Sequence, residues 1–118
     1  SIDLAPTMLG LAGVAIPAAM QGRDLGPLVR GERVAWRDDW YYEHTYARPP
    51  QHKIPKTEGV RTKQWKYTRY TDFTPPYEQL FDLVADPQER KNLAGDAAHT
   101  ATLVKLRARC DEYREQLR

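Results

Sequence analysis

The sequence predicts an α+β fold: a four-stranded antiparallel sheet with a C-terminal amphipathic helix packed on one face, preceded by a short helical segment. Four segments rich in aromatic or β-branched residues are joined by short connections, which is typical of antiparallel strands. Near the C-terminus, after a helix start at Asp96, apolar residues recur at spacings of three and four: Leu103, Leu106, Cys110, Tyr113 and Leu117. An apolar stretch between Asp3 and Gly13 predicts the short N-terminal helix.

Composition limits the function classes. The chain has 118 residues, 29% of them charged, and a net charge of +2, which is ordinary for a globular domain. A single cysteine excludes an internal disulfide. The apolar stretch at residues 11–20 is interrupted by Gly13 and Pro17, so it is too short to span a bilayer. We expect no signal peptide, because the first residues lack a basic segment, and the compartment (cytoplasmic or exported) stays open.

The predicted N-terminal helix at residues 3–13 is apolar apart from its capping residue, Asp3. Leu4, Met8 and Leu11 share one face, and residues 25–29 form a second short helical piece. A surface helix of a small free-standing domain should present a polar face. We therefore expect this helix to pack against a larger partner.

The strands are predicted from residue type and alternation. Trp40, Tyr41 and Tyr42 give the second half of segment 33–44 strand character. Residues 59–64 and 65–71 form two further strands around a turn at Thr62 to Gln64, and residues 80–84 form the fourth. Residues 45–57, rich in proline and basic residues, form an exposed loop between the first two strands.

After the fourth strand, the sequence predicts a one-turn helix. Asp86 is the expected N-cap, Pro87 occupies the first helical position, and Glu89 reaches back to complete a capping box. The turn would end near Asn92, and Leu93 would return to the core. This reading assigns structural roles to both acidic residues.

In their order along the chain, these motifs resemble the carboxy-terminal part of the type I sulfatases, the arylsulfatase-like hydrolases. Four signals carry the resemblance and together cover nearly the whole chain: residues 3–13 followed by 21–25; Tyr42-Glu-His44; Gly59-Val-Arg-Thr62 with Trp65-Lys-Tyr67; and Leu80-Phe-Asp-Leu83 with Asp86-Pro-Gln-Glu89 and Asn92-Leu93. The resemblance implies that residues 1–30 are the terminal helical segment of a missing catalytic domain. Residues 31–118 would be the C-terminal subdomain.

The resemblance also implies what this fragment lacks. Sulfatases use a formylglycine made from a Cys/Ser-x-Pro/Ala-x-Arg motif, together with a calcium ion held by Asp and Asn side chains. Here the one cysteine begins Cys110-Asp-Glu-Tyr-Arg114, and Glu112 stands where Pro or Ala is required. We expect no catalytic residue, metal ligand or cofactor in the fragment, which would be inactive alone. The parent would use calcium and formylglycine to hydrolyse sulfate esters or sulfamates.

Four residues are candidates for substrate binding at the rim of the parent's pocket. Glu43 and His44 could recognise a hydroxyl or acidic group, and His52 and Lys53 could contact an anionic sugar. The alternatives are a locally hydrogen-bonded pair at a strand end and solvated loop side chains. The expected partners are the missing N-terminal catalytic domain and a sulfated small molecule or glycan. The isolated fragment could also dimerise through its apolar helix.

An alternative function is an independent module that binds anionic polymers or single-stranded nucleic acid. Residues 30–70 hold ten Lys and Arg against five acids, with aromatic residues interleaved. In the sulfatase interpretation, Arg61 and Lys63 would instead add positive potential near a sulfated substrate, although strand cations commonly pair across the sheet. No ribonucleoprotein-type motif is present, and the aromatic residues are needed to build a core. The main prediction is therefore the sulfatase fragment, with neither nucleic acid nor membrane as a partner.

Overall fold

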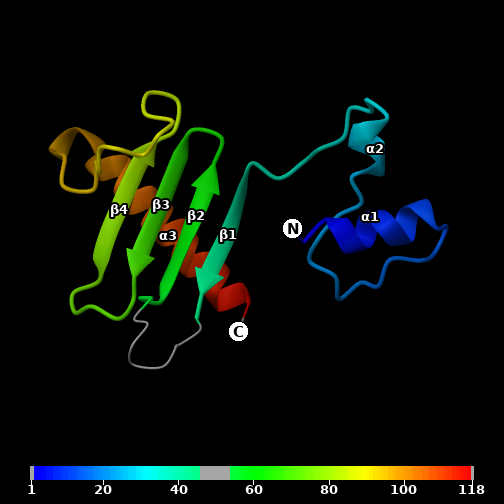
Figure 1. Cartoon of the computed structure of the whole chain (residues 1–118), viewed down its shortest axis with the longest axis horizontal. Helices are drawn as coiled ribbons and strands as arrows, with labels where there is room; N and C mark the ends of the chain where they lie inside the picture. The colour runs from blue at the N-terminus through cyan, green and yellow to red at the C-terminus, as the bar shows by residue number, and fades with distance from the viewer. Residues whose placement is uncertain (1, 46–53, 118) are drawn as a thin grey trace. The chain divides into compact units, whose positions relative to one another are not determined.

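The computed structural model describes residues 2–45 and 54–117. The chain forms two compact units, residues 1–36 and 37–118, which we describe separately. The first unit holds α1 (Leu4–Leu11) and α2 (Gly26–Val29). The second holds β1 (Asp39–His44), β2 (Thr57–Thr62), β3 (Trp65–Tyr70), β4 (Tyr77–Asp82), the 3-10 turn η1 (Ala97–His99) and α3 (Thr100–Gln116) (Figure 1). The predicted α+β fold is confirmed.

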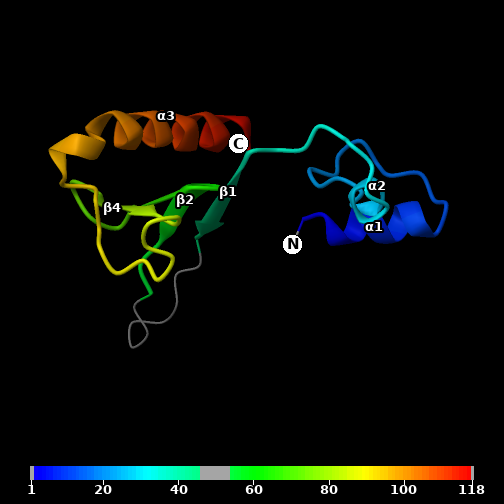
Figure 2. The same cartoon turned by 90° about the horizontal axis from the view of Figure 1, so that it is seen from above.

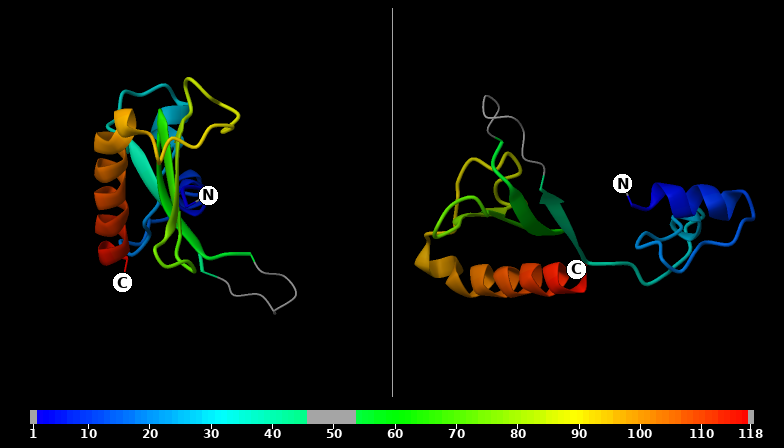
Figure 3. Two further views of the ribbon diagram at one scale, coloured as in Figure 1. Left: turned by 90° about the vertical axis from the view of Figure 1, so that its left-hand side faces the viewer. Right: turned by 90° about the horizontal axis from the view of Figure 1, so that it is seen from below.

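The second unit is an antiparallel meander in the order β1-β2-β3-β4, with α3 lying across one face (Figure 2). The strand register aligns four apolar side chains across the sheet: Tyr41, Val60, Tyr67 and Leu80. Three buried residues of α3 pack on this row: Leu103, Leu106 and Cys110. The edge-on view in Figure 3 shows the resulting two layers, helix on sheet. The predicted apolar stripe of the last helix is therefore confirmed as the helix side of the core.

The start of the last helix also follows the prediction, with one refinement. The side chain of Asp96 accepts a hydrogen bond from the backbone N–H of Ala98 at 2.9 Å. That cap begins the 3-10 turn η1, and α3 continues from it at Thr100. At the other end of α3, Leu117 is 45% exposed, so the apolar stripe reaches the core only as far as Tyr113.

The segment after β4 corrects two predictions. The strand ends at Asp82, so Leu83 and Val84 lie beyond it, and Val84 is 74% exposed. Residues 86–92 form turns rather than a helix. The carboxylate of Asp86 accepts from the backbone N–H of Lys91 at 2.8 Å, which closes a wider loop than an N-cap would. Glu89 adopts φ 54°, a left-handed conformation that no α-helix contains.

Asn92 shows why this segment is nevertheless tightly specified. Its side chain accepts from the backbone N–H of Leu80 and donates to the carbonyl of Glu78, both at 3.0 Å. These bonds satisfy backbone groups on the outer edge of β4, which would otherwise be open to another strand. Leu93 then enters the core, 9% exposed, as predicted. The segment is thus a cover for a sheet edge.

In the first unit, Asp3 precedes α1, but its side chain does not cap the helix. Its carboxylate instead accepts from the backbone N–H of Arg23 at 2.9 Å, tying the connector to the helix start. Gly13, with φ 68°, ends the helix region as predicted. The apolar residues predicted to need a partner are exposed: Leu4 by 57%, Met8 by 70% and Leu11 by 75%. We call these three residues the α1 stripe.

Gly59, in the middle of β2, is required by a close approach of its neighbours. A Cβ at this position would lie 2.2 Å from the carbonyl oxygen of Tyr67 and 2.6 Å from the ring of Tyr42. The Tyr42 hydroxyl reaches over this glycine and donates to the same carbonyl at 3.0 Å. Glycine in a strand interior commonly marks such an approach.

We expect Gly59→Ala to lower the free energy of unfolding by about 2 to 3 kcal/mol, because the added methyl group must displace backbone or ring. Urea unfolding of the chain measures the change. Gly95→Ala is the matched control, since a Cβ there meets nothing within 4 Å. Equal stability of the two variants would contradict the proposed contact.

Two carboxylates on the sheet anchor α3. Asp39 accepts from the Arg109 guanidinium at 2.7 Å and from the Tyr113 hydroxyl at 2.6 Å. Glu78, on β4, accepts from Arg107 at 2.6 Å and from Tyr67 at 2.6 Å. The arginine hydrogen bonds lower the pKa of both carboxyl groups below their ordinary values of 3.8 for Asp39 and 4.5 for Glu78.

These shifts predict acid destabilisation. Both carboxylates contribute stability above their unfolded-state pKa values, 3.8 and 4.5, and lose it as the pH falls through the lower folded values. We therefore expect the urea midpoint to fall between about pH 5 and pH 2. The double variant Asp39→Asn, Glu78→Gln should show a lower midpoint at neutral pH and a shallower acid decline. An unchanged acid decline would show that other groups control it.

Candidate functional site

Glu43 and His44, the predicted pair for substrate binding, lie at the end of β1 but on opposite faces of the sheet, because successive strand residues alternate. The Tyr41 hydroxyl on the helix side donates to Glu43 at 3.2 Å. A ligand bound to one face of the sheet could therefore contact Glu43 or His44, but not both. His52 and Lys53 fall outside the described residues.

Glu43 borders a cavity of about 410 Å³ between the end of the sheet and the end of α3. Its lining is mixed, with two carboxylates, a guanidinium, hydroxyl groups and one leucine: Tyr41, Glu43, Thr45, Glu58, Thr71, Arg114 and Leu117. The Nε atom of Arg114 is buried without a hydrogen-bond partner among the described residues. The cavity therefore has polar groups that a small polar ligand or water could satisfy.

Beneath this cavity lies a buried charge network that the sequence analysis missed. Arg69 donates to Glu58 at 2.6 Å and to Asp111 of α3 at 2.7 Å. The side chains of Arg69 and Glu58 are only 10% and 8% exposed. Tyr41 donates to Glu58 at 2.9 Å, and burial together with this hydrogen bond raises the pKa of the tyrosine. The tyrosine hydroxyl is therefore a stable donor, and the network serves to fix α3 on the sheet.

The sheet face opposite α3, which we call the distal face, carries His44. The register places three rows of residues on it: His44, Thr57, Tyr70 and Tyr77; Tyr42, Gly59, Thr68 and Gln79; Trp40, Arg61, Lys66 and Phe81. The Nε2 atom of His44 is buried and has no hydrogen-bond partner within the described ranges. The distal face therefore combines aromatic, hydroxyl and amide side chains with an imidazole nitrogen that has no partner among the described residues.

The basic residues Arg61, Lys63 and Lys66 lie in three different environments. Arg61 lies on the distal face with its guanidinium over the Trp40 ring, 5.7 Å from the centroid. Lys63 is exposed in the turn between β2 and β3. Lys66 is paired with Glu89 of the loop after β4. In the described part of the chain, the basic residues of the strands therefore make separate contacts with different partners.

Among the described residues, those that could supply sulfatase chemistry do not lie together in one site. Cys110 lies on the inner side of α3, fully buried in the core, and burial raises the pKa of its thiol to about 11. No group of three or more His, Cys, Asp or Glu side chains within residues 2–45 and 54–117 could hold a metal ion. In the same ranges, no helix is long and apolar enough to cross a membrane.

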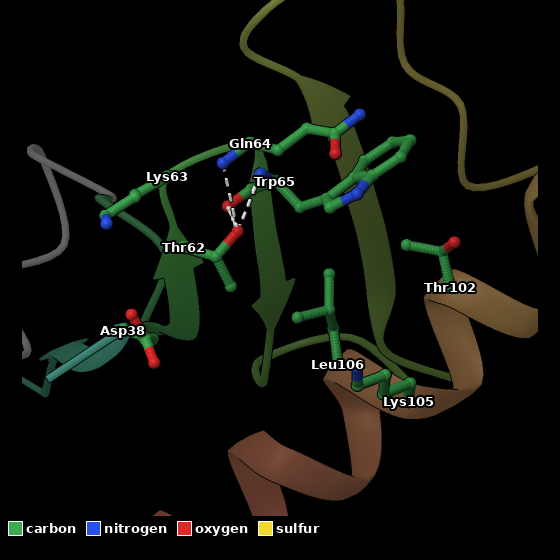
Figure 4. Close-up of a pocket in the computed structure, with 8 residues that line it drawn as sticks. All are labelled: Asp38, Thr62, Lys63, Gln64, Trp65, Thr102, Lys105 and Leu106. Atoms are coloured by element: carbon green, nitrogen blue, oxygen red, sulfur yellow. Dashed lines mark hydrogen bonds between the residues drawn. The ribbon is translucent and has the colours of Figure 1, made fainter.

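A second cavity, also of about 410 Å³, lies between α3 and the turn that joins β2 to β3 (Figure 4). It combines one indole ring, two lysines, a carboxylate and neutral polar groups around a buried leucine: Asp38, Thr62, Lys63, Gln64, Trp65, Thr102, Lys105 and Leu106. We call it the turn cavity. The sequence alone does not bring these residues together, because they come from three separate segments.

Comparisons with known proteins give one consistent result. The family model for the C-terminal part of N-sulphoglucosamine sulphohydrolase matches residues 1–116. A Δ4,5-hexuronate-2-O-sulfatase of Bacteroides thetaiotaomicron is 36% identical, over 96% of this chain and 23% of its own length. Arylsulfatase K of Canis lupus familiaris is 35% identical, over 79% of this chain and 18% of its own length.

Solved protein structures give the same result as the sequence comparisons. A protein in complex with its substrate, D-glucosamine-2-N,6-O-disulfate, superposes with a TM-score of 0.84 and 30% identity, over 97% of this chain and 23% of that one. The chain therefore spans about a quarter or less of the proteins it matches. Both units of the chain fall within the matched region.

Proposed function

The chain belongs to the sulfatase family described as N-sulphoglucosamine sulphohydrolase, C-terminal, and from that premise we propose that its parent protein hydrolyses sulfate esters or sulfamates of sugars. The observation that carries the proposal is the family match over residues 1–116, which includes both the helical unit and the sheet unit. The sugar preference rests on two similar proteins, one a hexuronate sulfatase and one solved with a glucosamine disulfate.

Within such an enzyme, this chain would complete the fold rather than supply the reacting groups. The α1 stripe, exposed by 57 to 75%, would pack against the catalytic domain. Burying apolar surface of this kind is the main favourable term in association. Cys110 lies in the core and the described carboxylates form no metal site, so formylglycine and calcium would belong to the catalytic domain. Those two groups would supply the nucleophile and charge stabilisation.

The end of β1 would border the substrate pocket. Among the described residues we assign that role to His44, because its buried Nε2 lacks a partner there. Glu43 lies on the other face, at the mixed cavity, so it would not contact the same ligand as His44. His52 and Lys53 stay predictions from sequence.

The test is sulfate release by the parent protein, expressed from its complete reading frame, on sulfated monosaccharides. We expect hydrolysis by the parent and none by the 118-residue chain alone. In the parent, His44→Gln should raise KM or lower kcat/KM by about tenfold if the imidazole contacts substrate. A parent that releases phosphate rather than sulfate, or neither, would overturn the proposal.

The alternative function, binding of nucleic acid or other anionic polymers, has less support. Tyr67 is fully buried and Trp65 packs against the core, so neither ring is free on the distal face. Arg69 is held between two carboxylates. Binding of a short oligonucleotide that weakens steeply with salt would restore this alternative.

A further inference from the structure

The turn cavity has the chemistry of a ligand site that neither the fold nor the proposed function accounts for. Figure 4 shows Leu106 between two sides, with Trp65 and Thr102 toward one and Asp38 and Lys63 toward the other. Leu106 is 4% exposed and forms part of the core, whereas Lys63 and Asp38 are exposed. The cavity is thus an open hollow with an apolar floor and a polar rim.

The hollow is held in shape by the β2–β3 turn. The Thr62 hydroxyl accepts from the backbone N–H of Gln64 at 3.2 Å and of Trp65 at 2.8 Å. The Gln64 amide donates to Asp82 of β4 at 3.0 Å. The indole of Trp65 meets the His99 ring in an edge-on contact, with centroids 5.5 Å apart. A ligand would therefore enter a site whose aromatic ring is already fixed, which lowers the entropic cost of binding.

The two lysines of the hollow differ from the cations that hold the sheet unit together. Each of the following lies within 4 Å of a carboxylate: Lys66, Arg69, Arg107, Arg109 and Arg114. Lys63 and Lys105 have no such partner among the described residues. With the one carboxylate of Asp38, the lining carries a net charge of +1, from two lysines less one acid. This unused positive charge favours an anionic group in a ligand.

We propose that the turn cavity binds an anionic saccharide unit. The C–H face of the sugar ring would pack on the indole of Trp65, as aromatic rings combine apolar area with defined geometry. Its hydroxyl groups would donate to Asp38 and exchange hydrogen bonds with Thr102. Its sulfate or carboxylate would be held by Lys63 and Lys105. This inference uses only the residues of the cavity, so it does not depend on the proposed sulfate hydrolysis.

Titration of the isotopically labelled 118-residue chain with N-acetylglucosamine 6-sulfate, followed by NMR, tests the proposal. We expect saturable shifts of the Trp65 indole N–H and of the backbone amides around Thr102, with a Kd of about 1 mM at low salt. Unsulfated N-acetylglucosamine should bind about fivefold more weakly. Sodium sulfate alone should leave the indole signal in place.

Variants locate the site. Lys63→Gln combined with Lys105→Gln should weaken binding about tenfold, since each exposed charge contributes a few-fold. Arg90→Gln combined with Lys91→Gln is the matched control, because it also removes two charges, both from exposed positions outside the cavity. The amide spectrum of each variant verifies that the fold is retained. Sulfate release by the parent is a separate measurement, so either proposal can fail alone.

Three results would overturn the proposal. The first is the absence of a Trp65 indole shift up to about 20 mM sugar, well above the expected Kd. The second is equal weakening by the Arg90→Gln, Lys91→Gln pair and by the two cavity substitutions, which would indicate binding by net charge alone. The third is binding of sulfate as strong as that of the sulfated sugar, which would indicate an anion site without sugar recognition.

Discussion

Replacing Arg69 with methionine is expected to lower the free energy of unfolding by about 3 to 5 kcal/mol, the cost of breaking a buried ion pair from one side. The guanidinium is held at 2.6 Å from Glu58 and 2.7 Å from Asp111. Without it, the Glu58 carboxylate, 8% exposed, keeps the Tyr41 hydroxyl and a more distant Arg114 nitrogen at 3.6 Å. Urea unfolding of the 118-residue chain measures the loss.

Two further variants separate burial from charge. Arg107→Met breaks a pair in which the arginine side chain is 41% exposed, so solvent screening should limit its cost to about 1 kcal/mol. Adding Glu58→Met to Arg69→Met should recover part of the loss, because the second change removes the uncompensated buried charge. A loss below about 1 kcal/mol for Arg69→Met, equal to an exposed pair, would contradict the network.

This network illustrates which features the sequence could not reveal. The strands were predictable from their alternating aromatic residues, and α3 was predictable from its apolar stripe, because both patterns are local. The contact between Arg69 and Asp111 joins positions 42 residues apart. It depends on the strand register and on how α3 crosses the sheet, neither of which the sequence specifies by itself. Long-range ion pairs of this kind are therefore visible only in the fold.

The turn after β4 illustrates a local signal that long-range contacts override. Asp86, Pro87 and Glu89 have the spacing of a helix start, yet Glu89 is engaged by Lys66 of β3. The Asp86 carboxylate accepts a hydrogen bond from the backbone N–H of Lys91, which closes a loop instead of capping a helix. A capping residue competes for the same backbone groups in turns and in helices, so the motif alone does not distinguish them.

For the candidate substrate-binding residues, in contrast, the sequence did contain the information that decides where they lie. Glu43 and His44 are adjacent in a predicted strand, and strand side chains alternate between faces. Their separation to opposite faces follows from that rule alone. The Nε2 atom of His44 is buried and has no hydrogen-bond partner among the described residues. This property could not have been inferred from the sequence, because it depends on the neighbouring strands.

The α1 stripe yields the prediction that most directly tests the link between this chain and a catalytic domain. Met8 and Leu11 are 70% and 75% exposed, so they add little to the stability of the isolated chain. We expect Met8→Gln with Leu11→Gln to change the unfolding free energy of the 118-residue chain by less than about 0.5 kcal/mol. In the complete parent, the same substitutions should cost about 2 to 4 kcal/mol, because apolar contacts are lost and two amides are buried.

Light scattering adds a second measurement on the isolated chain. The α1 stripe should drive self-association, since exposed apolar patches of this kind favour contacts between copies. The double variant should shift the chain toward the monomer. Val84→Gln is the matched control: Val84 is 74% exposed in the sheet unit, and its replacement should alter neither association nor the stability of the parent. Equal effects of the double substitution on the chain and on the parent would show that no catalytic domain covers the stripe, and the apolar helix would then need another explanation.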